Sequence, residues 1–280
     1  YSMGGMARIV GVTGPPGTGK STLVNGLIGR WRSSGLTVGV LAVDPTSPFS
    51  GGAVLGDRVR MQDHAGDPGV FIRSLATRGH TGGLSRSVRY MVTLLDAAGF
   101  DRVLLETVGV GQEEVEIKDI AQTIVFVTVP GLGDGIQAMK AGVLEIAHVY
   151  LVNKADIPAA ERAVADLQTM LAIGEERPAW TPPVLSSVAT RGEGISELVE
   201  ALDRHHAHLD ASGGLEDWKR STARSYVRDA VSALLEEAAV SLLREGDPRH
   251  AGDVDRVVRR EEDPFTVARR WLAGLKFSDD

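Results

Sequence analysis

Residues Gly14 to Ser21 have the types and spacing of a phosphate-binding loop. The segment GPPGTGKS matches the pattern G-x-x-x-x-G-K-[ST] at every fixed position. In such a loop the glycines let backbone N–H groups turn toward phosphate oxygens, and the following helix N-terminus adds partial positive charge. The alternative is a glycine-rich turn that binds nothing. The apolar, β-branched residues 7–13 and the helical pattern of residues 21–31 favour the phosphate-binding interpretation.

The loop predicts a set of nucleotide-binding residues with distinct roles. Lys20 can reach the β- and γ-phosphates, and the Ser21 hydroxyl can bind Mg²⁺. The residues expected to contact the nucleotide here are Gly14, Pro16, Gly17, Thr18, Gly19, Lys20, Ser21 and Thr22.

A second motif, Asn153-Lys154-Ala155-Asp156, follows the apolar run at residues 149–152. A carboxylate at Asp156 can accept hydrogen bonds from both N1–H and the 2-amino group of guanine, and adenine offers neither donor. An unpaired carboxylate would therefore disfavour ATP. Asn153, Lys154 and Asp156 are predicted to select guanine; the alternative is a helix-entry turn.

Acidic residues at strand ends are candidate Mg²⁺ ligands. The strand predicted at Arg102–Glu106 ends in an acid, and Gly109 follows three residues later, where its N–H can contact a γ-phosphate. Asp44 ends another predicted strand, and Asp57 lies farther along; either could join the metal shell. The alternative for Glu106 is an acid that only caps the end of its strand. The alternative for Asp44 is a residue that caps the turn at the following proline.

Two segments are candidates for nucleotide-responsive switches. Gln112 could orient a water molecule, but it lies three residues after Gly109, so a helix N-terminus is the preferred interpretation. The glycine-rich segment 130–140 contains Asp134 and Lys140, which we expect either to respond to the nucleotide or to form a plain surface connection.

Apolar strands that alternate with helical patterns predict an α/β fold, a mostly parallel sheet with helices on both faces. In such a sheet, ligands bind at the carboxyl ends of the strands, where all these motifs lie. The predicted strands are Arg8–Thr13, Thr37–Val43, Val70–Ser74, Arg102–Glu106, Thr123–Val129, Val149–Asn153 and Val184–Ser187. Helices are predicted at Ser85–Ala98 and Ala159–Ile173.

The chain ends in a helical segment that is too small to form a core alone. We expect a disordered lead at residues 1–7, a P-loop domain at 8–212 and a helical arm at 213–280, with helices at Tyr226–Arg244 and Asp263–Leu275. The apolar stripes of the arm predict a homodimer; packing on the parent domain is the alternative.

Composition excludes several classes of function. The 280 residues carry a net charge of -7, which argues against general affinity for nucleic acids, and no cysteine is present for disulfides or thiolate chemistry. The cluster His205, His206 and His208 is predicted to lie on a solvated helical face rather than to bind a metal. Without a signal peptide or an apolar run of roughly 20 residues, a cytoplasmic protein without membrane spans is expected.

Together these motifs resemble the MeaB/ArgK family of P-loop GTPases, which includes the methylmalonic aciduria type A protein. The most specific stretches are AVDPTSPFSGGAVLGD at Ala42–Asp57 and ETVGVGQ at Glu106–Gln112, supported by RGHTGGL at Arg78–Leu84. The resemblance implies a homodimeric chaperone that uses GTP hydrolysis to gate cofactor loading and to protect an adenosylcobalamin-dependent acyl-CoA mutase, such as methylmalonyl-CoA mutase.

The resemblance also implies residue roles. Phosphate and Mg²⁺ roles fall to Lys20, Ser21, Asp44, Asp57 and Glu106, and Asp134 and Lys140 fall in the loop that responds to the partner.

The sequence departs from the family pattern in two places. The N-terminal helical extension is nearly absent, and the guanine-backing Ser-Ala pair is replaced by Val188-Ala189, where the Ala189 N–H is expected to make the contact. Two other functions stay open: an ATPase or kinase linked to arginine/ornithine transport, and a GTPase that delivers nickel.

Overall fold

In the computed structural model the chain divides into two compact units, residues 1–222 and residues 223–280. Within them the structure describes residues 7–45, 64, 66–77, 86–107, 117–131, 145–172, 179–242, 250 and 252–273. No helix in this part of the chain is long and apolar enough to cross a membrane.

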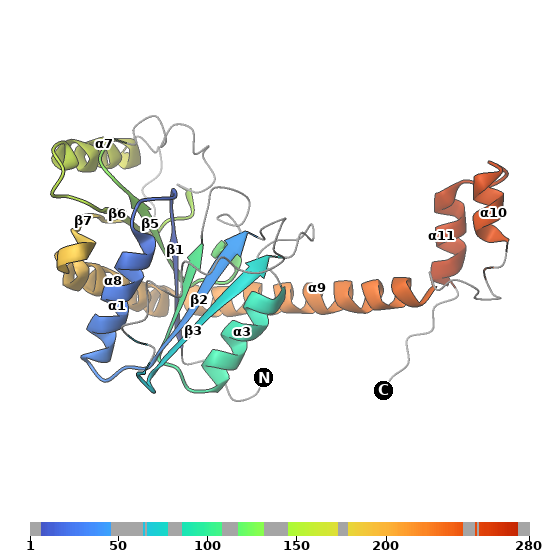
Figure 1. The fold of residues 1–280 in the computed structure, drawn as a ribbon, viewed down its shortest axis with the longest axis horizontal. Coiled ribbons are helices and arrows are strands. Elements are labelled where there is room, and N and C mark those ends of the chain that lie inside the picture. The colour runs from blue at the N-terminus through green and yellow to red at the C-terminus, as the bar shows by residue number, and fades with distance from the viewer. Residues whose placement is uncertain are drawn as a thin grey trace. The chain divides into compact units, whose positions relative to one another are not determined.

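The first unit is built on a seven-stranded sheet with the order β3-β2-β4-β1-β5-β6-β7 (Figure 1). All the described strand pairs are parallel. The strands are β1 (Arg8–Thr13), β2 (Val38–Pro45), β3 (Val70–Thr77), β4 (Arg102–Thr107), β5 (Thr123–Thr128), β6 (Val149–Val152) and β7 (Val184–Ser186). The predicted α/β fold class is confirmed, and β1 lies at the centre, where the strand order reverses and ligands bind in such sheets.

Helices cover both faces of this sheet and bury its strands. On one face, α1 (Lys20–Arg32) and α8 (Ile195–Ser212) pack on side chains such as Val12, Leu104 and Val125. The other face is covered by α3 (Arg86–Ala97) near β2 and β4 and by α7 (Ala160–Ala172) near β6 and β7. Strands covered on both faces explain why the sequence shows continuous apolar runs rather than strict alternation.

The helices that follow the sheet begin and end at residues different from those predicted. The predicted helix Tyr226–Arg244 overlaps α9, which runs from Gly214 to Leu242, and its last two residues lie outside the described part of the chain. It begins directly after Gly213, whose φ of 79° ends α8 in the left-handed region that favours glycine. In the second unit, α10 (Asp253–Val258) and α11 (Pro264–Ala273) follow; Asp263 caps α11 by accepting the Phe265 and Thr266 N–H groups.

The prediction of a solvated face for the histidine cluster is wrong for His205, whose side chain is only 1% exposed. His205 continues the buried stripe of α8, which includes Leu198 and Leu202 at helical spacing. Its Nδ1 lies 2.8 Å from Thr123 Oγ1, and its ring centroid lies 4.2 Å from that of His148. The helical period, rather than the cluster of like residues, decides the burial of this histidine.

Burial sets the charge state of this histidine pair. It lowers the pKa of His148 to about 4 and, with a smaller contribution from the charge of His148, that of His205 to about 3. The Ile124 N–H donates to His148 Nδ1 at 3.0 Å, which requires an unprotonated acceptor at that atom. The folded protein therefore holds both rings neutral at pH values where an unfolded chain would protonate them.

We predict that the free energy of unfolding falls as the pH is lowered from about 6.5 toward 4. In this range both histidines are protonated in the unfolded chain, whereas burial keeps them neutral in the folded protein. Each histidine contributes a slope of about 1.4 kcal/mol per pH unit within that window, and no slope above it. Urea unfolding of the wild type and of His205→Phe at several pH values measures this. The variant should show a shallower acid slope; equal slopes would contradict the assignment.

Candidate functional site

The loop between β1 and α1 has a backbone that requires glycine at two positions. Gly14 has a φ of 139°, and a Cβ there would lie 2.1 Å from the Val127 carbonyl oxygen. Gly19 has a φ of 89°, and a Cβ there would lie 2.5 Å from Asn153 Nδ2. The loop therefore approaches β5 and the segment after β6 more closely than any side chain permits.

Lys20 begins α1 and folds back over this loop. Its Nζ donates to the carbonyl oxygens of Gly14 at 2.6 Å and Pro15 at 2.9 Å, and the residue is 6% exposed. The Thr18 hydroxyl also donates to the Pro15 oxygen, at 2.9 Å. These bonds place a buried ammonium group beside the N-terminus of α1, where both can neutralise a phosphate.

Ser21 and Glu106 meet at the carboxyl ends of β1 and β4. The Ser21 hydroxyl donates to Glu106 Oε1 at 2.6 Å, and both side chains are buried. Glu106 reaches this place because β1 and β4 pair in parallel, with Val12 opposite Glu106. A hydroxyl and a carboxylate beside a phosphate-binding loop are oxygen ligands of the kind that Mg²⁺ prefers.

The Asn153 side chain joins three segments that are far apart in the sequence. Its Nδ2 donates to the Thr18 carbonyl oxygen at 2.8 Å. Its Oδ1 accepts the Ser187 hydroxyl and the Ala189 N–H, both at 3.1 Å. The amide therefore connects the phosphate-binding loop to the segment after β7. The Ala189 N–H, which is expected from the sequence to contact guanine, donates to Asn153 in this structure.

Lys154 and Asp156 extend this connection toward solvent. The Lys154 Nζ donates to the Gly17 carbonyl oxygen at 2.9 Å. The Asp156 carboxylate, 47% exposed, lies 3.4 Å from Arg191 Nη2, and Arg191 also pairs with Glu193 at 3.2 Å. The cation and the exposed carboxylate lie at the same edge of the site, so Arg191 can orient Asp156 for a ligand that donates hydrogen bonds.

The structure brings together most of the predicted site residues whose positions it describes. Those at the loop, the start of α1, the end of β4 and the segments after β6 and β7 lie at the carboxyl edge of the sheet, and Val188 is buried there beside Ala189. The side chain of Thr22 is exposed on the first turn of α1. For Asp44 the backbone is described, opposite Ala76 of β3. Outside the described residues are Asp57, Gly109, Gln112, Asp134 and Lys140.

Sequence reasoning missed two residues of this edge, Ser187 and Arg191. Ser187 directly precedes the Val188-Ala189 pair that was expected to face guanine, and a polar residue at a strand end was a usable signal. Arg191 gave no comparable signal, because its pairing with Asp156 depends on a turn that the sequence does not specify.

We predict that Asn153→Asp weakens GDP binding about tenfold to a hundredfold. The carboxylate keeps the acceptor for Ser187 and Ala189 but loses the donor to Thr18, which leaves a buried carbonyl facing negative charge at a cost of about 1–3 kcal/mol. Calorimetry measures the affinity, and thermal unfolding checks the fold. The matched control Ser187→Ala, which removes one neutral hydrogen bond, should lose less than about tenfold. Unchanged affinity in Asn153→Asp would show that the bridge does not support binding.

Comparisons with known proteins identify the family. Residues 1–242 match the sequence model of a family described as the methylmalonyl-CoA mutase-associated GTPase MeaB. A relative from Pyrococcus abyssi is 45% identical over 271 residues, which cover 96% of this chain and 83% of the relative. GTPase ArgK of Escherichia coli is 36% identical over 231 residues, 78% of this chain and 67% of that protein.

A solved structure agrees with these sequence matches. The crystal structure of a protein described as LAO/AO transport system kinase has a TM-score of 0.69 and 27% identity, and the match covers 98% of this chain and 83% of that one. The similarity extends over the sheet, the phosphate-binding loop and the guanine-type motif, so this chain belongs to the MeaB family and is a P-loop GTPase.

Proposed function

We propose that this GTPase is a chaperone of an adenosylcobalamin-dependent acyl-CoA mutase, such as methylmalonyl-CoA mutase, and that it gates cofactor loading and protects the mutase. The observation behind this proposal is the match of residues 1–242 to a family whose description names the mutase association. GTP hydrolysis would act as the timer of that association.

The nucleotide would bind along the carboxyl edge of the sheet. Lys20 and the α1 N-terminus would contact phosphate oxygens, and Asp156 would accept from the N1–H and 2-amino groups of guanine. Asn153 supports this arrangement because its amide already fixes the loop at Thr18. Lys154, whose ammonium lies on the Gly17 carbonyl oxygen, would hold the loop and the base-binding segment together.

The residues present fit Mg²⁺. Ser21 and Glu106 supply a buried hydroxyl and carboxylate 2.6 Å apart beside the loop, and Asp44 and Asp57 are further candidates for the same shell. When bound, the ion would neutralise charge on the β- and γ-phosphates. The chain's own contribution is to hold these oxygens in place on α1 and β4 and to exclude water from them, since both side chains are buried.

Nothing in the described structure favours the two competing functions. A kinase linked to transport would need a pocket for a second substrate in addition to the nucleotide site. The argument for this function is the description of one similar solved protein as a transport system kinase. Nickel delivery needs soft or imidazole ligands. The chain has no cysteine, and the described residues contain no group of three or more histidine or acidic side chains placed to hold a metal ion.

The proposal predicts that a mutase partner accelerates GTP hydrolysis. We expect slow basal turnover, because Val110 stands directly after Gly109, where a water-orienting side chain would be needed. Phosphate release is measured with and without purified methylmalonyl-CoA mutase in Mg²⁺. Lys140→Ala should keep basal turnover and lose the stimulation, since we assign Lys140 to the partner-responsive segment.

Two controls make this experiment decisive. Ser21→Ala should lose both basal and stimulated turnover, because it removes a proposed Mg²⁺ ligand. Excess chelator should do the same to the wild type. No stimulation by any B12-dependent acyl-CoA mutase would contradict the chaperone function. Equal loss of basal and stimulated rates in Lys140→Ala would contradict the switch role alone.

We also propose a homodimer formed largely by residues 213–280. On α9 the side chains of Val227, Val231, Leu234 and Leu235 are about half exposed or more and recur at helical spacing. Phe265 and Leu272 are exposed on α11. A two-fold interface would remove this apolar surface from water. Light scattering should report a dimer at micromolar concentration and a monomer for Leu234→Glu/Leu235→Glu; a wild-type monomer would reject the proposal.

A further inference from the structure

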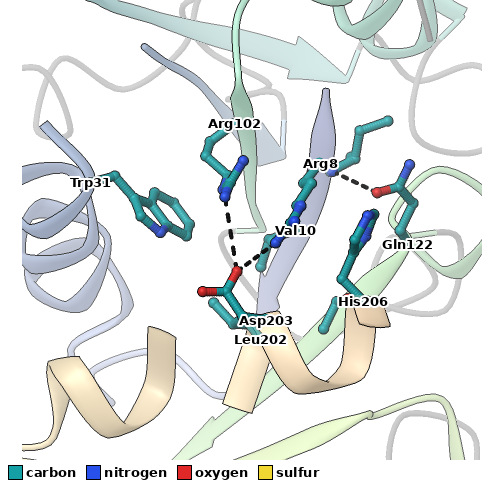
Figure 2. A pocket seen from close by; sticks show the side chains of 10 residues that line it. Arg8, Val10, Trp31, Arg102, Gln122, Leu202, Asp203 and His206 are labelled. Carbon is teal, nitrogen blue, oxygen red and sulfur yellow. Dashed lines mark hydrogen bonds and ion pairs between the residues drawn. The ribbon is translucent and has the colours of Figure 1, made fainter. Parts of the chain in front are cut away.

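A small pocket lies at the amino-terminal ends of β1 and β4, at the opposite end of β1 from the phosphate-binding loop (Figure 2). Arg8 is the first residue of β1 and Arg102 the first of β4, so both lie at this end of the sheet. Trp31 of α1 and the α8 residues Asp203 and His206 also line this Arg8–Arg102 pocket. The proposed nucleotide chemistry uses none of these residues.

Two like charges are held side by side in this pocket. Arg8 and Arg102 are direct partners in the parallel register, an arrangement that is unfavourable unless anions compensate it. The Arg102 side chain is only 14% exposed. Burial, and after it the charge of Arg8, lowers the pKa of Arg102. This pair therefore attracts a negative group.

A single carboxylate in the pocket serves both cations. Asp203 Oδ1 lies 2.5 Å from Arg8 Nη1 and 3.8 Å from Arg102 Nη2, and in Figure 2 the dashed lines from the two arginines meet at this carboxylate. The charge of the neighbouring Asp101 also acts on Arg102, and Arg102 Nη1 donates to the Asp101 carbonyl oxygen at 3.0 Å. The Asp101 carboxylate itself accepts from the N–H and hydroxyl of Thr37, at 2.8 Å each. Asp203 itself is 51% exposed, so its side chain has room to turn toward solvent.

Two polar atoms of the pocket residues are buried without a hydrogen-bond partner. They are Trp31 Nε1 and His206 Nδ1. An indole nitrogen can only donate, and a buried donor without an acceptor costs about 1–3 kcal/mol. The two guanidinium groups and the indole N–H can only donate, whereas His206 Nδ1 donates or accepts according to its tautomer, so the pocket holds more donors than acceptors. The group that satisfies them best is rich in acceptors and negatively charged.

We propose that the Arg8–Arg102 pocket binds a small oxyanion, a phosphate or carboxylate group, and that Asp203 is its internal substitute. The space beside the guanidinium groups is about that of one water molecule, so an incoming oxyanion needs the Asp203 side chain to turn away. The two arginines would then bind the oxyanion from neighbouring strands.

The test uses the full chain saturated with GDP, so that the phosphate-binding loop is occupied. The indole ¹H–¹⁵N signal of Trp31, identified by its loss in Trp31→Phe, is followed while inorganic phosphate or succinate is added. We expect a saturable shift with at least one of the two probes, and the probe that saturates tells phosphate from carboxylate. A shift that chloride reproduces, or that never saturates, would overturn the proposal.

Variants separate the oxyanion site from general charge effects. Asp203→Asn removes the internal competitor and should tighten binding of the effective probe at least tenfold. Arg8→Gln should weaken it at least tenfold. Arg204→Gln, on the same helix but exposed and paired with Glu200, is the matched control and should leave binding unchanged. Failure of Asp203→Asn to tighten binding, or of Arg8→Gln to weaken it, would overturn the proposal. GDP affinity, measured in parallel, should be the same in all variants.

Discussion

The Asn153 amide is the interaction on which the rest of the site depends. It donates to the Thr18 carbonyl oxygen and accepts from Ser187 and Ala189, so one buried side chain connects the segments after β1, β6 and β7. Because it is buried, each lost bond leaves a polar group without water to replace it. The close approach that it requires also explains why glycine is needed at position 19.

The parallel sheet brings the remaining groups to the same edge. β1 lies between β4 and β5, so the loop after β1 lies between the end of β4 and the end of β5. Glu106 therefore meets Ser21 on one side, and Val127 limits Gly14 on the other. The same register places Arg8 beside Arg102 at the far end of the sheet, where no nucleotide group is expected.

Features with short-range causes could be predicted from the sequence. The strand, glycine loop and helix from Arg8 to Arg32 follow from apolar β-branched residues, then glycines, then a helical pattern, and the strand bounds agree within a few residues. Contacts between distant segments could not be predicted in the same way. The Asn153 bridge spans 135 residues to Thr18, and the Arg191–Asp156 pair depends on the turn after β7. The burial of His205 was predicted wrongly for another reason. The cluster of three histidines suggested a solvent-exposed face, although the helical spacing places His205 on the buried stripe of α8.

We infer that the carboxyl edge of the sheet binds guanine nucleotides and selects them through Asp156. Calorimetry of GDP, IDP and ADP with the wild type and with Asp156→Ala tests it most directly, because inosine lacks the 2-amino group and adenine lacks both donors. We expect the wild type to bind GDP most tightly, IDP more weakly and ADP most weakly. Loss of the carboxylate should cost GDP about 2–5 kcal/mol and remove the order. Equal wild-type affinities for GDP and ADP, or undiminished discrimination in Asp156→Ala, would contradict it.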